Sequence, residues 1–429
     1  MSRVLAREMG RHAGTEVTLQ GWVHNIRKIG AVAFLVLRDR SGQAQVVLEG
    51  DMLAALPTLE SVVAVSGWVK PDARAPGGAE LRARQLSVIS PAHRLPPFEL
   101  NRPELTAGPE VVLDHRVLGL RHPKLHATLT VQSELIRGFR EFLRGEGFTE
   151  VHTPKIVATG TEGGSELFPV QYFEQQAYLA QSPQFYKQML VGAGYERVYE
   201  VGAVYRAEQH NTSRHLNEYV SLDVEMGFIS GEEEIMALEE RMLAQMFAGV
   251  AETCEAELAL HGAKVPEVRD VPRVPLAEAQ AILERRFGKL LPPGDLDPES
   301  ERLLCQYVAE SGRPGLVFIT RWPRFVRPMY AQPTADAPEL TASFDLLMNG
   351  LEVTTGGQRM HDPTVLEASI RSRGLDPEGF AFYLEVFWHG MPPHGGFAIG
   401  AERLTARLLG LGNVREASAF PRDRTRLVP

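Results

Sequence analysis

The stretch YRAEQHNTSRHLNE at 205–218 decides the fold together with GGFAIGAERL at 395–404. Each stretch carries an arginine among acidic and glycine residues, Arg206 in the first and Arg403 in the second. A guanidinium group binds phosphate oxygens in bidentate fashion, so two arginines from distant segments suit the binding of a polyphosphate from both sides. We therefore expect a domain that folds these two stretches around a nucleotide.

The pattern around Arg206 has an ordinary alternative. Arg206 and Glu208 lie two residues apart at the end of an apolar strand, so both side chains leave the same face. An isolated pair of this kind is most often a surface ion pair. The loop that follows is more polar than a plain hairpin, with Gln209, His210, Asn211, Arg214 and His215. The second stretch, likewise, can be a simple strand-to-helix turn with a solvated arginine.

A third segment, a helix followed by a strand that ends at Pro154, completes a resemblance. The three segments resemble the signature motifs of class II aminoacyl-tRNA synthetases, and the residues around them resemble the aspartyl-tRNA synthetases of the shorter archaeal-like form. The resemblance covers essentially the whole chain, which lacks the large insertion of typical bacterial members. It implies an α+β multidomain fold, with an OB-fold β-barrel and a catalytic domain on an antiparallel sheet flanked by helices.

The domain organisation follows from composition. Residues 1–90 contain five short β-branched runs with a helical interruption near 51–56, which indicates a five-stranded barrel over 1–95; another small barrel is the alternative. Residues 96–127 are proline-rich and indicate a hinge. We expect a catalytic domain over 128–429, opened by a helix at 128–146, with a small insertion near 260–315.

Further elements are expected from the apolar pattern of the catalytic domain. Helices are predicted at 178–194 and 229–258. Strands are predicted at 149–156, 198–208, 220–228, 315–323, 343–357 and 381–387.

Charge and cysteine content narrow the class of protein. The formal net charge is −9, but residues 1–100 carry 12 Lys+Arg against 9 Asp+Glu, so a mildly basic domain precedes an acidic one. The two cysteines, Cys254 and Cys305, are far apart, so neither a disulfide nor a structural zinc site is expected. The charged start and the lack of a long apolar run predict a cytoplasmic protein without a membrane span.

The resemblance implies roles for the nucleotide-binding residues. Arg206 is expected to bind the α-phosphate, Glu208 the adenine amino group, and Arg403 the adenine or the γ-phosphate; these three are the expected catalytic residues. Gly395, Gly396 and Gly400 would allow close approach of the backbone to the ligand. The complete expected ATP site is Arg206, Ala207, Glu208, Arg214, His215, Leu216, Glu352, Gly400, Ala401, Glu402 and Arg403.

Two carboxylates in an apolar setting indicate a metal site. Asp345 and Glu352 lie seven residues apart in SFDLLMNGLE, and unpaired buried charges are costly. Mg²⁺, which prefers carboxylates together with substrate phosphates, is the favoured explanation, and a structural salt bridge is the alternative. The resemblance implies that Glu352 and Thr355 hold the ion, with Asp345 assisting.

The resemblance also implies an aspartate pocket. Lys187 and Arg359 are expected to bind the side-chain carboxylate and Asp223 the α-ammonium group. Glu162 lies in a glycine-rich loop that is either a lid or an inert surface loop. The expected pocket is Glu162, Gln184, Phe185, Tyr186, Lys187, Arg206, Asp223, Thr355 and Arg359. Two cations around one carboxylate predict rejection of asparagine.

Recognition of tRNA is expected on the barrel. Phe34 and Gln45 match the pair that reads the central anticodon uridine in this family, whereas packing of Phe34 in the core is the alternative. His24 and Pro91 replace a tryptophan and a lysine of members that charge tRNA(Asp) alone. We therefore expect charging of both tRNA(Asp) and tRNA(Asn), with a tRNA-dependent amidotransferase acting on the second product.

Three rival functions remain at this point. One is a synthetase that charges tRNA(Asp) alone. Another is a tRNA-independent amino-acid ligase such as an asparagine synthetase, which the β-rich domain disfavours. The third is a regulatory RNA-binding protein, which the nucleotide-binding residues disfavour. A homodimer that uses the helix at 128–146 is also expected.

Overall fold

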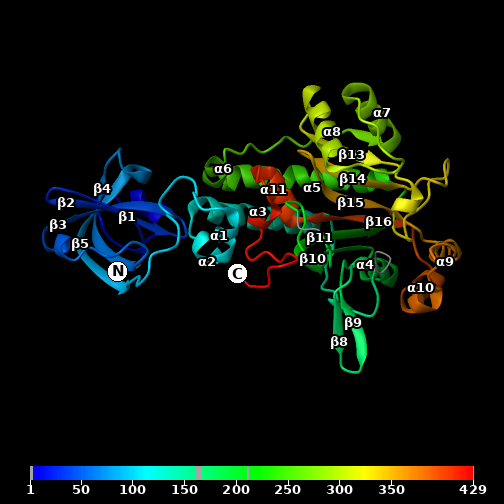
Figure 1. Ribbon diagram of the computed structural model, residues 1–429, viewed down its shortest axis with the longest axis horizontal. Helices are drawn as coiled ribbons and strands as arrows, with labels where there is room; N and C mark the ends of the chain where they lie inside the picture. The colour runs from blue at the N-terminus through cyan, green and yellow to red at the C-terminus, as the bar shows by residue number, and fades with distance from the viewer. Residues whose placement is uncertain (1–2, 161–165, 210–211, 429) are drawn as a thin grey trace. The chain divides into compact units, whose positions relative to one another are not determined.

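The computed structural model describes residues 3–160, 166–209 and 212–428. Its chain separates into two compact units, Met1–Pro123 and Lys124–Pro429 (Figure 1). The first unit carries the β-barrel, and the second carries the large sheet and the stretches around Arg206 and Arg403.

The first unit contains a closed five-stranded barrel in the order β1-β2-β3-β5-β4. Its strands are β1 (Glu16–Ile29), β2 (Val32–Asp39), β3 (Gly42–Glu49), β4 (Val62–Pro71) and β5 (Ala79–Ser90). Along β2, Ala33, Leu35 and Leu37 are fully buried while the residues between them are partly exposed, as expected for a strand with one face in the core. The predicted five-stranded barrel is confirmed, and a short 3₁₀ turn at Gly50–Ala54 lies at the predicted helical interruption.

The segment after the barrel contains more helix than its prolines indicated. Two short helices, α1 (Pro109–Asp114) and α2 (Arg116–Gly119), lie within it. The long helix α3 (Pro123–Gly145) begins before the predicted position 128. Proline is tolerated at a helix start because the missing backbone N–H has no partner there in any case.

The second unit is built on one eight-stranded sheet in the order β12-β13-β14-β15-β16-β11-β10-β6. Neighbouring strands are antiparallel except β6 with β10 and β12 with β13, which confirms the predicted sheet. The strands are β6 (Thr149–Glu150), β10 (Arg197–Tyr205), β11 (Glu218–Gly227), β12 (Arg273–Pro275), β13 (Leu316–Thr320), β14 (Ser343–Met348), β15 (Leu351–Arg359) and β16 (His394–Gly400).

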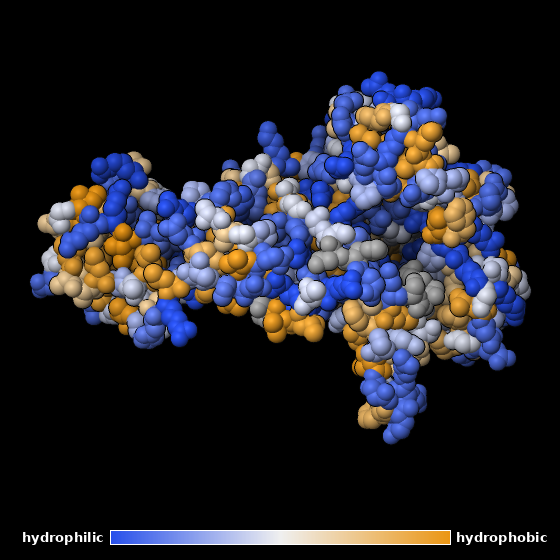
Figure 2. Space-filling model, in the orientation of Figure 1, coloured by the Kyte–Doolittle hydropathy of each residue, from blue (hydrophilic) through white to orange (hydrophobic). Residues whose placement is uncertain are grey.

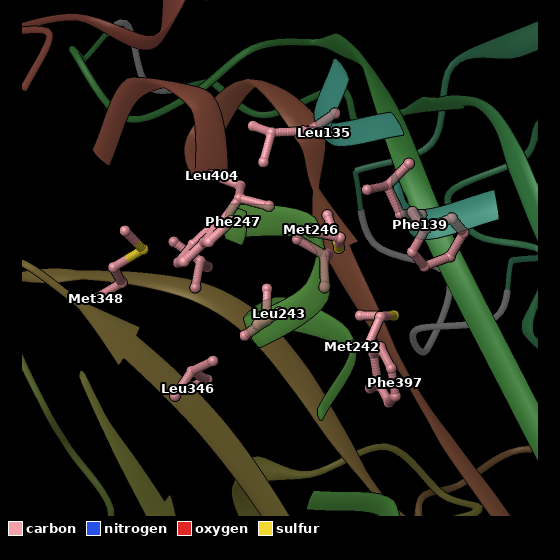
Figure 3. Close-up of a cluster of buried hydrophobic side chains, with 14 of the residues drawn as sticks. Leu135, Phe139, Met242, Leu243, Met246, Phe247, Leu346, Met348, Phe397 and Leu404 are labelled. Atoms are coloured by element: carbon pink, nitrogen blue, oxygen red, sulfur yellow. The ribbon is translucent and has the colours of Figure 1, made fainter. Parts of the chain in front are cut away.

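A hydrophobic core joins this sheet to the helices α3, α5 (Glu232–Thr253) and α11 (Ala401–Leu409). Figure 3 shows Phe139 of α3, Met246 of α5 and Phe397 of β16 within the cluster. The other helices are α4 (Gln184–Leu190), α6 (Glu255–His261), α7 (Leu276–Phe287), α8 (Pro298–Glu310), α9 (Pro363–Ser372) and α10 (Ala381–Trp388). The core fixes one face of the sheet, so the ligand-binding side chains project from its other face and its ends.

One predicted strand was wrong. Residues 381–387 form α10, because Tyr383, Leu384 and Phe387 are buried at helical spacing. A short apolar run does not distinguish a strand from a helix by periodicity alone.

Three other predictions need smaller corrections. Residues 149–156 are mostly irregular, with only β6 and the start of β7 (Ile156–Val157) in strand. The predicted helix at 178–194 is shorter, because β9 (Gln175–Leu179) occupies its first residues and pairs with β7 and β8 (Pro169–Tyr172). The helix predicted at 229–258 is divided into α5 and α6 at Cys254.

Within the described residues, no helix combines the length and the apolar character that crossing a lipid bilayer requires. Figure 2 shows hydrophobic residues scattered among hydrophilic ones on the face in view.

Candidate active site

The second unit contains a cavity of about 480 Å³ on the sheet, and most of the expected site residues line it. The expected residues at its wall are Gln184, Arg206, Glu208, Arg214, His215, Leu216, Asp223, Glu352, Thr355, Arg359, Gly400, Glu402 and Arg403. They come from the start of α4, from the connection between β10 and β11, from β11, β15 and β16, and from the start of α11. The stretches around Arg206 and Arg403, far apart in sequence, therefore meet at one cavity.

Other expected residues lie behind this wall or outside the description. Ala207, Tyr186, Lys187, Asp345 and Ala401 do not line the cavity, and neither does Phe185, whose ring packs 4.4 Å from that of Tyr383. Glu162 falls outside the described residues.

At one end of the cavity, Arg206 lies beside Glu208. Their side chains form an ion pair at 4.0 Å, and the Oε2 atom of Glu208 receives no hydrogen bond from any described residue. Arg206 also lies over the ring of Tyr219, 5.9 Å from its centroid. A guanidinium fork, a carboxylate acceptor and an aromatic face together suit a purine nucleotide. Tyr219 was missed from the sequence, although it directly follows the quoted stretch 205–218.

The loop that carries Arg206 is fixed from two sides. Asn217 donates its side-chain N–H groups to the carbonyl oxygens of Arg206 and Glu208, at 2.6 and 3.1 Å. A segment from near the end of the chain lies along the same loop: the backbone N–H of Asn217 donates to the carbonyl of Arg422 at 2.9 Å, and Arg424 donates to the carbonyl of Gln209 at 3.2 Å.

Arg403 closes the same end from the first turn of α11. Its Nη1 atom donates to the Oε1 atom of Glu352 at 3.4 Å, and its Nε atom donates to the carbonyl of Arg214 at 3.4 Å. Gly400, directly before α11, lines the cavity. Positions 395 and 396 need glycine because the neighbouring strands leave no room for a side chain. A Cβ atom on Gly396 would lie 1.9 Å from a carbonyl oxygen of β11.

Helix α8 contributes a carboxylate that the sequence reasoning missed. Glu301 accepts a hydrogen bond from Arg214 and another, at 3.2 Å, from the backbone N–H of Glu352. Burial raises the pKa of Glu301 to about 7, against the opposing charge of Arg214. The 260–315 region therefore supplies a residue that supports the nucleotide end of the cavity.

At the other end, Asp223 and Arg359 line the cavity, and Lys187 and Glu225 lie behind them in a cluster of alternating charges. The Nζ atom of Lys187 lies 2.9 Å from Asp223 Oδ1 and 3.5 Å from Glu225 Oε2, and Arg359 Nε lies 3.3 Å from Glu225 Oε1. Gln184 donates to Glu225 at 3.3 Å. Glu225 was missed from the sequence, although it follows Asp223 by two residues and so shares its face of β11. This cluster can hold a zwitterion that carries one more carboxylate.

The expected metal ligands occupy adjoining strands. Thr355 on β15 donates to Glu352 Oε1 at 3.2 Å, and both residues face the cavity. Asp345 on β14 forms a buried ion pair with Arg327 at 2.7 Å, and its Oδ1 atom receives no hydrogen bond from the described residues. Burial raises the pKa of Asp345. No cluster of three His, Cys, Asp or Glu residues suited to a metal occurs in the described ranges.

The donor set at Glu352 and Thr355 nevertheless fits Mg²⁺, because this ion commonly takes one or two carboxylates and completes its shell with substrate phosphates and water. For Asp345 itself, the buried ion pair with Arg327 is the structural salt bridge that was the alternative to a metal site.

The barrel carries Phe34 and Gln45 on its outer face. Phe34 is only partly buried, so it does not belong to the barrel core, and Arg27 lies 5.5 Å from its ring centroid. Gln45 on β3 donates to Glu80 at 3.2 Å. An aromatic ring beside an arginine and an amide is typical of surfaces that stack and read unpaired bases.

The two residues expected to discriminate between tRNAs lie near one short segment of the barrel. His24 is buried and its Nδ1 atom accepts a hydrogen bond from Arg38 at 2.8 Å, and Arg38 pairs with Glu60 at 2.8 Å. Burial, followed by the charge of Arg38, lowers the pKa of His24 to about 4. Pro91 is exposed directly after β5, and the next residue bonds to Ser61.

Comparisons with known proteins agree with this geometry. Residues 108–424 match the family of class II tRNA synthetases (D, K and N), and residues 17–89 match the OB-fold nucleic acid binding domain of the anticodon-binding type. The chain is similar to an asparaginyl-tRNA synthetase from Pyrococcus horikoshii in complex with asparaginyl-adenylate, with a TM-score of 0.93, 33% identity and full coverage of both chains. The chain therefore belongs to the class II tRNA synthetases.

Relatives with higher identity narrow the family. Aspartate–tRNA(Asp/Asn) ligases from Deinococcus radiodurans and Thermus thermophilus are 52% and 53% identical over 100% of this chain and 99% and 100% of their own. The aspartate–tRNA(Asp) ligase of Pyrococcus abyssi is 44% identical over 97% of both chains. Within its class, the chain belongs to the aspartate–tRNA ligase family, as the residues around the signature motifs predicted.

Proposed function

We propose that the chain activates L-aspartate with ATP and transfers the aspartyl group to the 3′ end of tRNA(Asp) and tRNA(Asn). The observation that carries this proposal is the division of one cavity into a nucleotide end, with Arg206 and Arg403, and an end whose wall holds Arg359 and Asp223, with the buried Lys187 paired to Asp223 behind it. Two relatives that are about half identical to this chain are named aspartate–tRNA(Asp/Asn) ligases, and these names support the same substrates.

The chemistry follows from this division. The α-carboxylate of aspartate attacks the α-phosphorus of ATP, pyrophosphate leaves, and aspartyl-adenylate forms. A hydroxyl of the terminal tRNA ribose then attacks the aspartyl carbonyl, and AMP leaves. Arg206 stabilises the negative charge that develops on the α-phosphate oxygens. No covalent nucleophile from the chain is required, because positioning and charge stabilisation carry both steps.

Glu352 and Thr355 would hold Mg²⁺, which when bound neutralises phosphate charge. The pairing of Arg403 with Glu352 is long, at 3.4 Å, and partly exposed, and Arg403 would turn from this carboxylate to a phosphate when ATP binds. Asp345 pairs with Thr355 across neighbouring strands and does not line the cavity, so it would assist the ion only through the electrostatic effect of its charge.

Selection of aspartate follows from the charges of the cluster. Lys187, Arg359, Asp223 and Glu225 together are close to neutral. The α-ammonium group of aspartate would pair with Asp223, which shifts Lys187 and Arg359 toward the side-chain carboxylate. Asparagine would leave this positive charge without its partner, a penalty of several kcal/mol.

Acceptance of both tRNAs is proposed from His24 and Pro91. Neither residue offers the anticodon a charge, because His24 is buried and its pKa is low, and a proline carries no donor or charge. Phe34 and Gln45 would read the uridine that both anticodons share. Aspartyl-tRNA(Asn) would then be the substrate of a tRNA-dependent amidotransferase. The alternative is a ligase for tRNA(Asp) alone, the activity named for the Pyrococcus abyssi relative.

The arrangement of the chain completes the proposal. Residues 1–95 would bind the anticodon, 96–127 would act as a hinge and 128–429 would catalyse the reaction. The outer face of α3, which borders an open groove at Leu129, Ile136 and Arg140, would form a homodimer interface. We place the enzyme in the cytoplasm, where its tRNA substrates are.

The direct test is charging of purified tRNA(Asp) and tRNA(Asn) transcripts with labelled aspartate, compared by kcat/KM. Comparable values support the proposal. Charging of tRNA(Asp) alone would retain the synthetase but exclude the dual specificity, and charging of neither would exclude both. Formation of asparagine without tRNA would instead indicate the tRNA-independent ligase.

A further inference from the structure

One edge of the cavity is formed by hydrophobic side chains that remain largely exposed. Phe325 and Val326, in a 3₁₀ turn at Arg324–Val326, line the cavity and are 70% and 42% exposed. Arg373, just after α9, lines the same edge. We call residues 324–326 and Arg373 the aromatic rim. An exposed aromatic ring at a cavity mouth has no role in the core and is available for a ligand.

The two cations of the aromatic rim, Arg373 in the cavity wall and Arg324 next to Phe325, differ from the other arginines of the cavity. Arg206, Arg214 and Arg403 each lie beside a carboxylate. Among the described residues, no carboxylate lies within ion-pair distance of Arg324 or Arg373. Burial and the charge of Arg324 lower the pKa of Arg373. The rim is therefore a site of positive charge that the protein itself does not neutralise.

The rim is held in place by contacts from two sides. Arg373 donates hydrogen bonds to the backbone carbonyls of Arg324 and Arg327, which fixes the turn. Gly294, in the loop between α7 and α8, lies under the ring: a Cβ atom there would be 2.9 Å from Phe325 Cζ, and the residue has a φ of +82°. The ring is thus supported on one side and open on the other.

The chemistry of the rim fits the unpaired end of an RNA. Aromatic rings stack on unpaired bases whatever their identity, and neighbouring arginines attract the phosphates between them. The ATP phosphates already have Arg206 and Arg403, and aspartate has Lys187 and Arg359. In the proposed reaction the remaining anion is the tRNA, whose terminal ribose must reach the cavity.

We propose that the aromatic rim binds the single-stranded 3′ end of the tRNA, with a base on Phe325 and the backbone beside Arg324 and Arg373. This inference rests on the proposed function. It assigns to the rim, and to the loop of the 260–315 region beneath it, the guidance of the acceptor end into the cavity.

The test combines changes in the protein with a change in the RNA. Phe325→Ala and Arg324→Gln are compared with matched controls: Trp388→Ala, an exposed aromatic outside the cavity wall, and Arg371→Gln, an exposed arginine that pairs with Glu367. Binding of each full-length protein to the tRNA(Asp) transcript and to the same transcript without its unpaired 3′ end is measured. Aspartate-dependent ATP–pyrophosphate exchange, which needs no tRNA, is measured in parallel.

The expected result is specific to the RNA end. Phe325→Ala should weaken binding of the intact tRNA by about tenfold, a typical effect of losing one stacked base, and Arg324→Gln should weaken it through the loss of a phosphate contact. Both variants should bind the shortened tRNA as the unmodified chain does. Exchange and the control variants should be unaffected. Equal losses for both RNAs, a parallel loss of exchange, or unchanged binding would each overturn the inference. Absence of exchange in the unmodified chain would instead contradict the proposed function.

Discussion

The Nζ atom of Lys187 donates a hydrogen bond to Asp223 Oδ1 at 2.9 Å, and the two side chains are 0% and 2% exposed. A buried ion pair must be satisfied on both sides, because removal of one partner leaves the other charge without compensation. Lys187 also lies 3.5 Å from Glu225, so it serves two carboxylates. The amino-acid end of the cavity is therefore preorganised by charges that a substrate can rearrange.

Lys187→Met is expected to raise the aspartate KM in the exchange reaction by at least about thirtyfold, because a buried charge pair with the substrate is lost. The KM for ATP should change much less. Equal effects on both substrates would place Lys187 outside the aspartate pocket. Because the substitution also leaves Asp223 and Glu225 with less positive charge, thermal unfolding of the variant should be recorded, and Lys187→Met with Glu225→Gln should recover part of any lost stability.

Arg206→Ala is expected to lower the rate of aspartate-dependent ATP–pyrophosphate exchange by about 10²–10³, the usual cost of removing a group that stabilises developing negative charge. The side chain is 37% exposed, so folding should be retained. Arg206→Lys keeps the charge but not the planar fork, and should recover only part of the rate. Near-normal exchange in Arg206→Ala would contradict the assigned role.

Glu352→Gln separates the metal role from a structural one. The variant should need more Mg²⁺ for half-maximal exchange at saturating ATP, because an amide is a weaker ligand than a carboxylate. Asp345→Asn should mainly destabilise the protein, by about 3–5 kcal/mol, because it leaves Arg327 buried without its counter-charge. An unchanged Mg²⁺ requirement in Glu352→Gln would remove this residue from the metal site.

His24→Trp combined with Pro91→Lys should lower kcat/KM for tRNA(Asn) while that for tRNA(Asp) is retained. Because His24 is buried beside Arg38, the larger ring must displace the local network, so urea unfolding of the variant should accompany the charging assay. Equal changes for both tRNAs would exclude these two positions from discrimination.

The low pKa of His24 predicts a pH dependence of stability. Its folded-state pKa of about 4 lies below the ordinary value of 6.5, so the unfolded chain binds more protons between these values. The contribution of His24 is therefore complete above about pH 6.5 and is lost as the pH falls toward about 4. Urea unfolding of the barrel at about pH 7 and about pH 5 should show a smaller difference for His24→Gln than for the unmodified chain. His93→Gln, at an exposed site, is the control and should retain the full difference.

The sequence was sufficient for elements whose pattern is local. The barrel strands alternate along their length, and the helix of 128–146 shows a clear apolar stripe, so both were found. The run at 381–387 was predicted as a strand and is a helix. Its sequence pattern does not show which side chains are buried, because the elements that pack on it decide this. The prediction that Arg206 and Arg403 lie at one site came from the resemblance to known motifs. Their separation along the sequence does not by itself indicate that they are close in space.

Side chains whose role depends on distant partners could not be identified in advance. Glu301 pairs with Arg214 across the fold, and nothing in the sequence around either residue indicates the other. Glu225 could have been found, since it lies on the same face of a strand as Asp223. Phe325 gave no signal, because exposure of an aromatic ring is visible only after folding.

The contact of Arg424 with Gln209 spans 215 positions of the chain. During synthesis, the loop around Arg206 leaves the ribosome long before the segment that lies along it. The contacts between this segment and the loop can therefore form only late in synthesis, even if the sheet has already begun to assemble. We therefore expect the loop around Arg206 to be the last part of the nucleotide end to gain its full set of contacts during translation.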